Sequence, residues 1–142
     1  MANYSKNARR AGALLWTVQG LLALLFLFAG GMKLVMPIEV LAQQSSLPGP
    51  FMKFIGVAEF LGAIGLILPG LLHIRPGLTP LAAAGLVTIM IGATAISVGT
   101  LGVASALFPL SVGLLSSFVA YGRWRLVPIG AAGHSRVLQP AI

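Results

Sequence analysis

The chain has 142 residues, of which 58% are hydrophobic and 8% are charged. Soluble domains carry about 25% charged residues, so this composition excludes a surface that water alone could solvate. The formal net charge is +7, but the basic residues flank apolar segments and form no stripe with interleaved aromatic residues, so no nucleic-acid partner is predicted. The sequence contains no cysteine, which excludes thiolate catalysis, disulfides and cysteine-ligated metals.

These observations predict an all-α integral membrane protein whose main partner is the lipid bilayer. Four apolar segments approach the roughly 20 residues that a helix needs to cross a bilayer. The predicted transmembrane helices comprise residues 11–35, 52–72, 78–98 and 102–121. They predict a four-helix bundle that forms a single membrane domain over residues 1–142.

The connections between the predicted spans differ in length. The first span is expected to stop before Pro37, because a proline ring clashes with a continuing helix. The connection that follows is the only long one, and its residues 38–44 are expected to form a short interfacial helix. Residues 126–142 are predicted to form a C-terminal tail.

The positive charges predict how the four spans are oriented. Only Lys33 and Lys53 fall on one side of the membrane, and the other side holds seven basic residues: Lys6, Arg9, Arg10, Arg75, Arg123, Arg125 and Arg136. The positive-inside rule makes this second side cytoplasmic. We therefore predict that both termini are cytoplasmic, in a bacterial-type inner membrane.

An acidic residue inside the second predicted span is the first candidate for a functional group. Glu59 has Gly56, Gly62 and Ala63 at spacings of three and four residues, so all of them share one face of the helix. A carboxylate facing lipid would be very costly, whereas small neighbours let another helix come close. We therefore expect Glu59 to point into the bundle.

Lys33 continues a comparable face on the first span. Gly30 and Ala29 precede it by three and four residues, and Gln19 lies further along the same face. Because the first two spans are antiparallel and the depths are compatible, Lys33 and Glu59 are predicted to pair near the outer leaflet. Two interpretations remain open: a structural ion pair, or a ligand-binding site formed by Lys33, Glu59 and Gln19.

No catalytic, metal or cofactor site is predicted from the remaining residues. The two histidines, His73 and His134, fall near the predicted cytoplasmic face. Haem held within the bundle would need a buried histidine, so none is expected.

Several segments resemble DoxX-like membrane proteins. The most specific is residues 55–69, IGVAEFLGAIGLILP, which resembles the second helix of that family in its glutamate and its Gly-Leu-x-x-Pro ending. Weaker resemblance is carried by residues 28–34, 82–86, 90–93 and 121–123. The resemblance covers roughly residues 14–125 and implies a four-helix membrane bundle. Many members carry a histidine near the position of Ser97, and its absence weakens a metal or proton-relay role here.

The resemblance leaves the activity open. The family is named after a subunit linked to thiosulfate:quinone oxidoreduction, and relatives have been associated with redox complexes and with membrane protein assembly. The small size and short loops lead us to predict a non-catalytic subunit or assembly factor of a membrane complex. One alternative is a quinone-linked redox component in which Lys33 or Gln19 binds a quinone carbonyl and a partner supplies electrons. Another is an enzyme or carrier for a lipophilic small molecule near Lys33 and Glu59. Small-residue pairs would also permit a homo-oligomer.

The predicted orientation can be tested with single cysteines in intact cells. Ser5→Cys and Ser135→Cys should resist an impermeant thiol reagent, because both positions are predicted to be cytoplasmic. Ser46→Cys should react from outside. Labelling at position 5 together with protection at position 46 would reverse the orientation.

Overall fold

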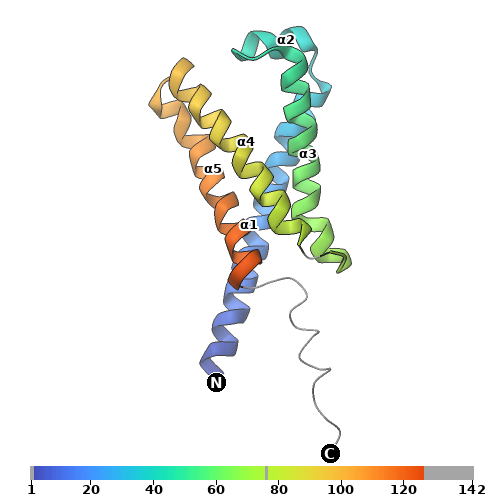
Figure 1. Cartoon of the computed structure of the whole chain (residues 1–142), viewed down its shortest axis with the longest axis vertical. Helices are drawn as coiled ribbons and strands as arrows, with labels where there is room; N and C mark the ends of the chain where they lie inside the picture. The colour runs from blue at the N-terminus through green and yellow to red at the C-terminus, as the bar shows by residue number, and fades with distance from the viewer. Residues whose placement is uncertain (1, 76, 127–142) are drawn as a thin grey trace, which may run out of the picture.

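The computed structural model describes residues 2–75 and 77–126, which form α-helices and one π-helical turn. Four long helices run along the molecule, and a short helix caps one end (Figure 1). In chain order the elements are α1 (Ala2–Val35), α2 (Ile38–Gln44), α3 (Gly49–Leu72), α4 (Leu78–Thr100), α5 (Val103–Tyr121) and the π-helical η1 (Gly122–Leu126).

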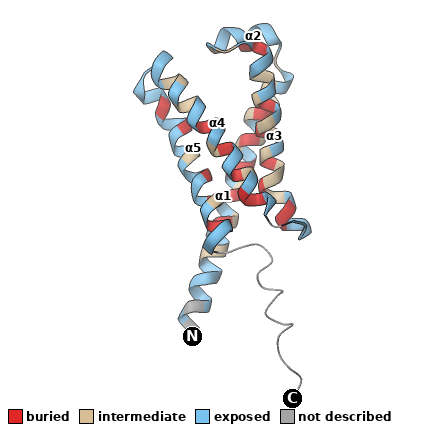
Figure 2. Ribbon diagram, in the orientation of Figure 1, coloured by how far each residue is buried: buried red, intermediate tan, exposed pale blue. Residues whose placement is uncertain are grey.

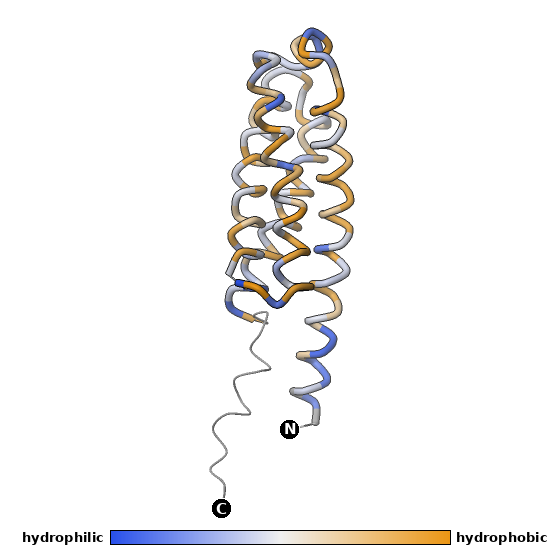
Figure 3. The backbone as a smooth tube through the Cα atoms, turned by 90° about the vertical axis from the view of Figure 1, so that its right-hand side faces the viewer, coloured by the Kyte–Doolittle hydropathy of each residue, from blue (hydrophilic) through white to orange (hydrophobic). Residues whose placement is uncertain are grey.

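The long helices have the length and composition of membrane spans, and this confirms the prediction of an all-α protein with four spans. The spanning segments are Ser5–Val35, Gly49–Leu72, Leu78–Thr100 and Val103–Leu126. Hydrophobic residues predominate along the four spans (Figure 3), and many of the large ones are exposed on the outside of the bundle. The predicted tail, residues 126–142, lies outside the described residues except for Leu126.

Helix α1 begins well before the predicted start at residue 11. Its 34 residues correspond to about 51 Å of helix, against about 30 Å of hydrocarbon core. The extra turns are polar and extend beyond the other helices (Figure 3). The apolar run marks only where the helix enters lipid, whereas alanine, lysine and arginine favour continuing the helix into water.

The long connection has the predicted short helix. Helix α2 covers Ile38–Gln44 and buries Leu41 against the bundle. Helix α3 then begins at Gly49, three residues before the predicted start at residue 52, with Pro50 in its first turn. A proline is well tolerated there, because the first backbone N–H groups of a helix have no intrahelical acceptor.

The long helices associate as two closely packed pairs, α1 with α3 and α4 with α5. Contacts between α3 and α4 join the pairs, and α1 touches α5 more sparsely. Toward η1 the two pairs lie together, whereas toward α2 they diverge (Figure 1). Buried residues accordingly concentrate where the pairs meet (Figure 2). The core there is formed by Leu22, Ala23, Phe26, Ala63, Leu66, Ala83, Leu86, Met90, Val112 and Val119.

Glycines set how closely the helices approach. A Cβ added to Gly30 of α1 would lie 2.7 Å from the carbonyl oxygen of Gly56 and 2.8 Å from the backbone nitrogen of Phe60. Both atoms belong to the α3 backbone, so α1 and α3 are in direct backbone contact at this point. Further along the same face of α3, a Cβ on Gly62 would meet Leu86 of α4 at 2.7 Å, which confirms that the Glu59 face of α3 packs against its neighbours.

The glycine contact gives a prediction with an adjacent control. Gly30→Ala should destabilise the protein by about 1–3 kcal/mol, because the added methyl group overpacks two rigid backbones. Gly31→Ala should be neutral or stabilise by up to about 1 kcal/mol, since nothing lies within 4 Å of a Cβ there and alanine favours helix over glycine. Thermal unfolding in detergent measures both, and equal melting temperatures would contradict the contact.

Candidate functional site

An ion pair lies at the contact between α1 and α3. The Lys33 ammonium is 2.6 Å from Oε2 of Glu59, which confirms the predicted pairing. The Glu59 side chain is 4% exposed and that of Lys33 is 21% exposed. The carboxylate is therefore enclosed by protein, while the ammonium remains partly open.

The geometry of the pair follows from the helices that carry it. Lys33 and Glu59 each follow a contact glycine, Gly30 or Gly56, by three residues, so each lies on the contact face of its own helix. Cα–Cβ bonds tilt toward the N-terminus of a helix. Because α1 and α3 are antiparallel, these tilts bring the two side chains toward one another along the helix axes.

The second lysine of this end takes a different partner. Lys53 donates a hydrogen bond to the carbonyl oxygen of Leu34 at 2.5 Å, at the end of α1. It thus satisfies one of the last carbonyl groups of that helix, which have no intrahelical donor. Glu59 is therefore paired with Lys33 and not with Lys53, which lies six residues away on a different face of α3.

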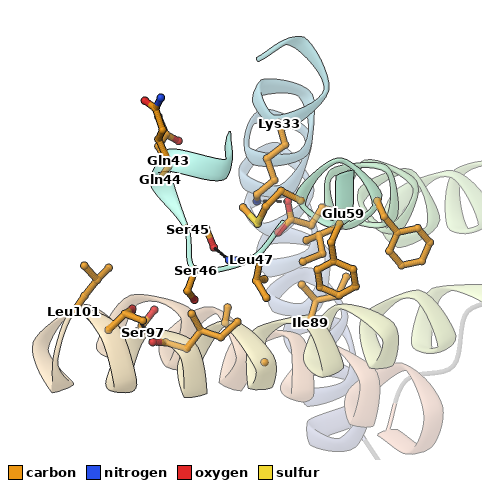
Figure 4. A pocket seen from close by; sticks show the side chains of 18 of the residues that line it. Lys33, Gln43, Gln44, Ser45, Ser46, Leu47, Glu59, Ile89, Ser97 and Leu101 are labelled. Atoms are coloured by element: carbon orange, nitrogen blue, oxygen red, sulfur yellow. Dashed lines mark hydrogen bonds and ion pairs between the residues drawn. The ribbon is translucent and has the colours of Figure 1, made fainter. Parts of the chain in front are cut away.

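The ion pair forms part of the wall of a cavity of about 560 Å³ between the diverging helix pairs (Figure 4). One wall belongs to α3 and a second to α4, where Gly92 and Ala93 leave room. The end of α2 and the turn that follows it, residues 43–47, lie across the end of the cavity. Most of the lining is apolar, including Phe54, Ile55, Ile89, Ile96 and Leu101. The volume falls within the range of small-molecule sites.

The hydroxyl groups on the α4 wall are largely occupied by their own helix. Thr88 donates to the carbonyl oxygen of Ala84 at 3.1 Å, and Thr100 donates to that of Ile96 at 2.8 Å. Such bonds satisfy a polar side chain within a membrane helix without a further partner. The lining also includes serine hydroxyls and glutamine amides, and the Lys33 ammonium is its one positively charged donor.

Gln19, the third predicted site residue, does not line this cavity. It is fully buried toward the other end of the bundle, where its amide nitrogen donates to the carbonyl oxygen of Leu66 at 2.7 Å. Its amide oxygen accepts a 2.5 Å hydrogen bond from Nε of Arg123. The structure thus brings Lys33 and Glu59 together and separates Gln19 from them.

Arg123 is the buried polar residue that sequence reasoning missed, because it was counted only among the basic residues of the flank. It is 5% exposed, and its guanidinium lies 5.1 Å from the centre of the Trp16 ring, within the range of a cation–π contact. Buried Val119 and Ser116 precede it by four and seven residues. That helical spacing was the signal that Arg123 continues the buried face of α5.

No group of three or more histidine, aspartate or glutamate residues within the described part of the chain could hold a metal ion. His73 ends α3 in a left-handed conformation with φ 54°. His134, the other histidine, lies outside the described residues.

The fold and the site define a small four-helix integral membrane protein with an apolar cavity that contains an ion pair. The sequence model of the DoxX-like family matches residues 17–119. The chain belongs to the DoxX-like family, as the resemblance implied. No curated protein and no solved structure matches the chain significantly.

A double-mutant cycle measures the coupling between the two charges. Lys33→Met and Glu59→Gln should each destabilise the protein, by less than the roughly 3–5 kcal/mol typical of breaking a fully buried pair, because Lys33 is partly exposed. The double variant should recover much of the loss. Chemical or thermal unfolding in detergent gives the three free energies. Losses that simply add would mean that the two side chains do not interact.

Proposed function

We propose that this chain is a non-catalytic membrane protein that binds a lipophilic small molecule in the cavity between α3 and α4. The observation that carries this proposal is the combination of an apolar cavity of about 560 Å³ with an ion pair in its wall. Ligand sites in proteins are mostly apolar, with a few polar groups that orient the ligand. Ionisable residues within membrane spans also mark sites of function.

Binding without catalysis fits the groups that line the cavity. The lining residues include no histidine, aspartate or tyrosine. Its one acid, Glu59, is already paired with the Lys33 ammonium at 2.6 Å. General acid–base catalysis would need a group free to exchange a proton with a substrate.

The cavity also has a route to lipid. The lining includes four exposed residues: Gly92 of α4, Leu101 just after α4, and Phe51 and Phe54 of α3. In the proposed orientation, with both termini in the cytoplasm, this end of the bundle faces the outer leaflet. A ligand could thus enter sideways from the bilayer. A role as subunit or assembly factor of a membrane complex is compatible with such binding, since a bound lipophile could be shared with a partner.

Filling the cavity tests the proposal. Gly92→Leu should abolish retention of a bound lipophile, because the new side chain occupies the cavity while nothing lies within 4 Å of a Cβ at this position. Gly85→Leu is the matched control, since Gly85 is equally open on the same helix but does not line the cavity. Mass spectrometry of extracts from protein purified out of native membranes measures retention.

The outcomes separate the candidate functions. A lipophile present in the wild type and Gly85→Leu, and lost from Gly92→Leu, supports the proposal, and a quinone among such molecules would favour a redox role. Equal retention by all three proteins would refute binding in this cavity. A stoichiometric protein partner without any lipophile would support a subunit that does not bind a ligand.

A further inference from the structure

We infer that the ligand is an uncharged, single-chain lipid whose polar end carries a hydroxyl or primary amide group and binds against the ion pair of Lys33 and Glu59. The inference rests on the proposed binding function and specifies the chemical class of the ligand. Three properties of the cavity support it: the net charge of its wall, the hydrogen-bonding capacity that the ion pair leaves unused, and the volume.

The charges of the wall select against a charged ligand. Lys33 and Glu59 are the charged residues that line the cavity, and they neutralise each other at 2.6 Å. An anionic head group would be attracted by the ammonium but repelled by the adjacent carboxylate. A cationic head group would be attracted by the carboxylate but repelled by the ammonium. Either charge would lose its hydration without a net opposite charge to replace it. An uncharged polar group avoids this cost.

The unused hydrogen-bonding capacity selects a group that both accepts and donates. An ammonium has three N–H donors, and one of those on Lys33 is bonded to Oε2 of Glu59. Among the described residues, neither the other donors of Lys33 nor Oε1 of Glu59 has a partner. A ligand hydroxyl can accept a hydrogen bond from Lys33 and at the same time donate one to Glu59. A primary amide can do the same. A ketone or an ether would leave the carboxylate oxygen without a donor.

The volume limits how much of a ligand the cavity can enclose. A cavity of about 560 Å³, at about 30 Å³ per water-sized group, has room for roughly 20 non-hydrogen atoms. One alkyl chain with a small polar end fits this space, whereas a two-chain phospholipid exceeds it and carries charges. The apolar lining, with Phe54, Ile55 and Ile89 near the ion pair, suits such a chain.

A series of probes with one chain and different head groups tests the inference. Hexadecanol, hexadecyl sulfate and hexadecyltrimethylammonium share the same alkyl chain, and the last two keep their charge at any working pH. Each is titrated into the full-length protein in phosphatidylcholine nanodiscs and followed by native mass spectrometry. Binding that disappears in Gly92→Leu is counted as binding to the cavity. Hexadecanol should bind about tenfold more tightly than either charged probe, since a hydrogen bond to a charged group contributes enough for such a ratio.

Substitutions of Lys33 or Glu59 should change the order of affinity in which the cavity binds the three probes. Glu59→Gln leaves the ammonium without its counter-ion and should shift preference toward the sulfate. Lys33→Gln leaves the carboxylate and should shift preference toward the ammonium probe. Lys53→Gln, which removes a nearby lysine that does not line the cavity, should keep the order of the wild type. The wild-type series remains decisive if a charge variant fails to fold.

The failures are distinguishable. If a charged probe binds the wild-type cavity as tightly as hexadecanol, the inference about the head group is wrong, although the binding function stands. If no probe shows binding that depends on Gly92, both the inference and the proposed binding function are refuted.

Discussion

The backbone contact between α1 and α3 at Gly30 and Gly56 is the constraint on which the rest of the structure depends. It fixes the register of the two helices, because a Cβ at either glycine would lie within 2.7 Å of an atom of the other helix. Lys33 and Glu59, three residues beyond these glycines, are then brought to 2.6 Å. The ion pair is therefore a consequence of the helix contact, and its direction follows from the tilt of side chains on antiparallel helices.

The two ends of the bundle differ because polar contacts close one of them. Near the chain termini, Gln19 links the carbonyl oxygen of Leu66 on α3 to Arg123 on η1, and Arg123 lies over Trp16 of α1. Hydrogen bonds across membrane helices help hold them together. At the other end the helix pairs diverge (Figure 1), and the cavity occupies the space between α3 and α4. Polar contacts thus close the bundle at Gln19, and the cavity lies at the opposite end, beside Lys33.

Sequence patterns predicted the features that one helix, or two consecutive helices, encode. Apolar length predicted four spans, and small neighbours at helical spacing predicted the pairing of Lys33 with Glu59. The start of α1 was predicted too late, because hydropathy marks where a helix leaves the lipid and not where the helix itself begins in water. Arg123 was misjudged because a basic residue at the end of a span usually lies in the flank. The cavity could not be predicted from the sequence, because it depends on the angle between two helix pairs.

The ion pair contributes little that helix packing does not already provide. A buried pair is weak evidence for stability, because desolvation offsets much of the attraction between the charges. The glycine contacts of α3, with α1 at Gly56 and with α4 at Gly62, already hold three helices together through close packing. What packing cannot provide is a local dipole in an apolar wall, with donors on Lys33 that face the cavity. In the binding function proposed above, such a dipole would discriminate among lipophilic molecules by charge and hydrogen bonding, and the pair would serve recognition more than cohesion.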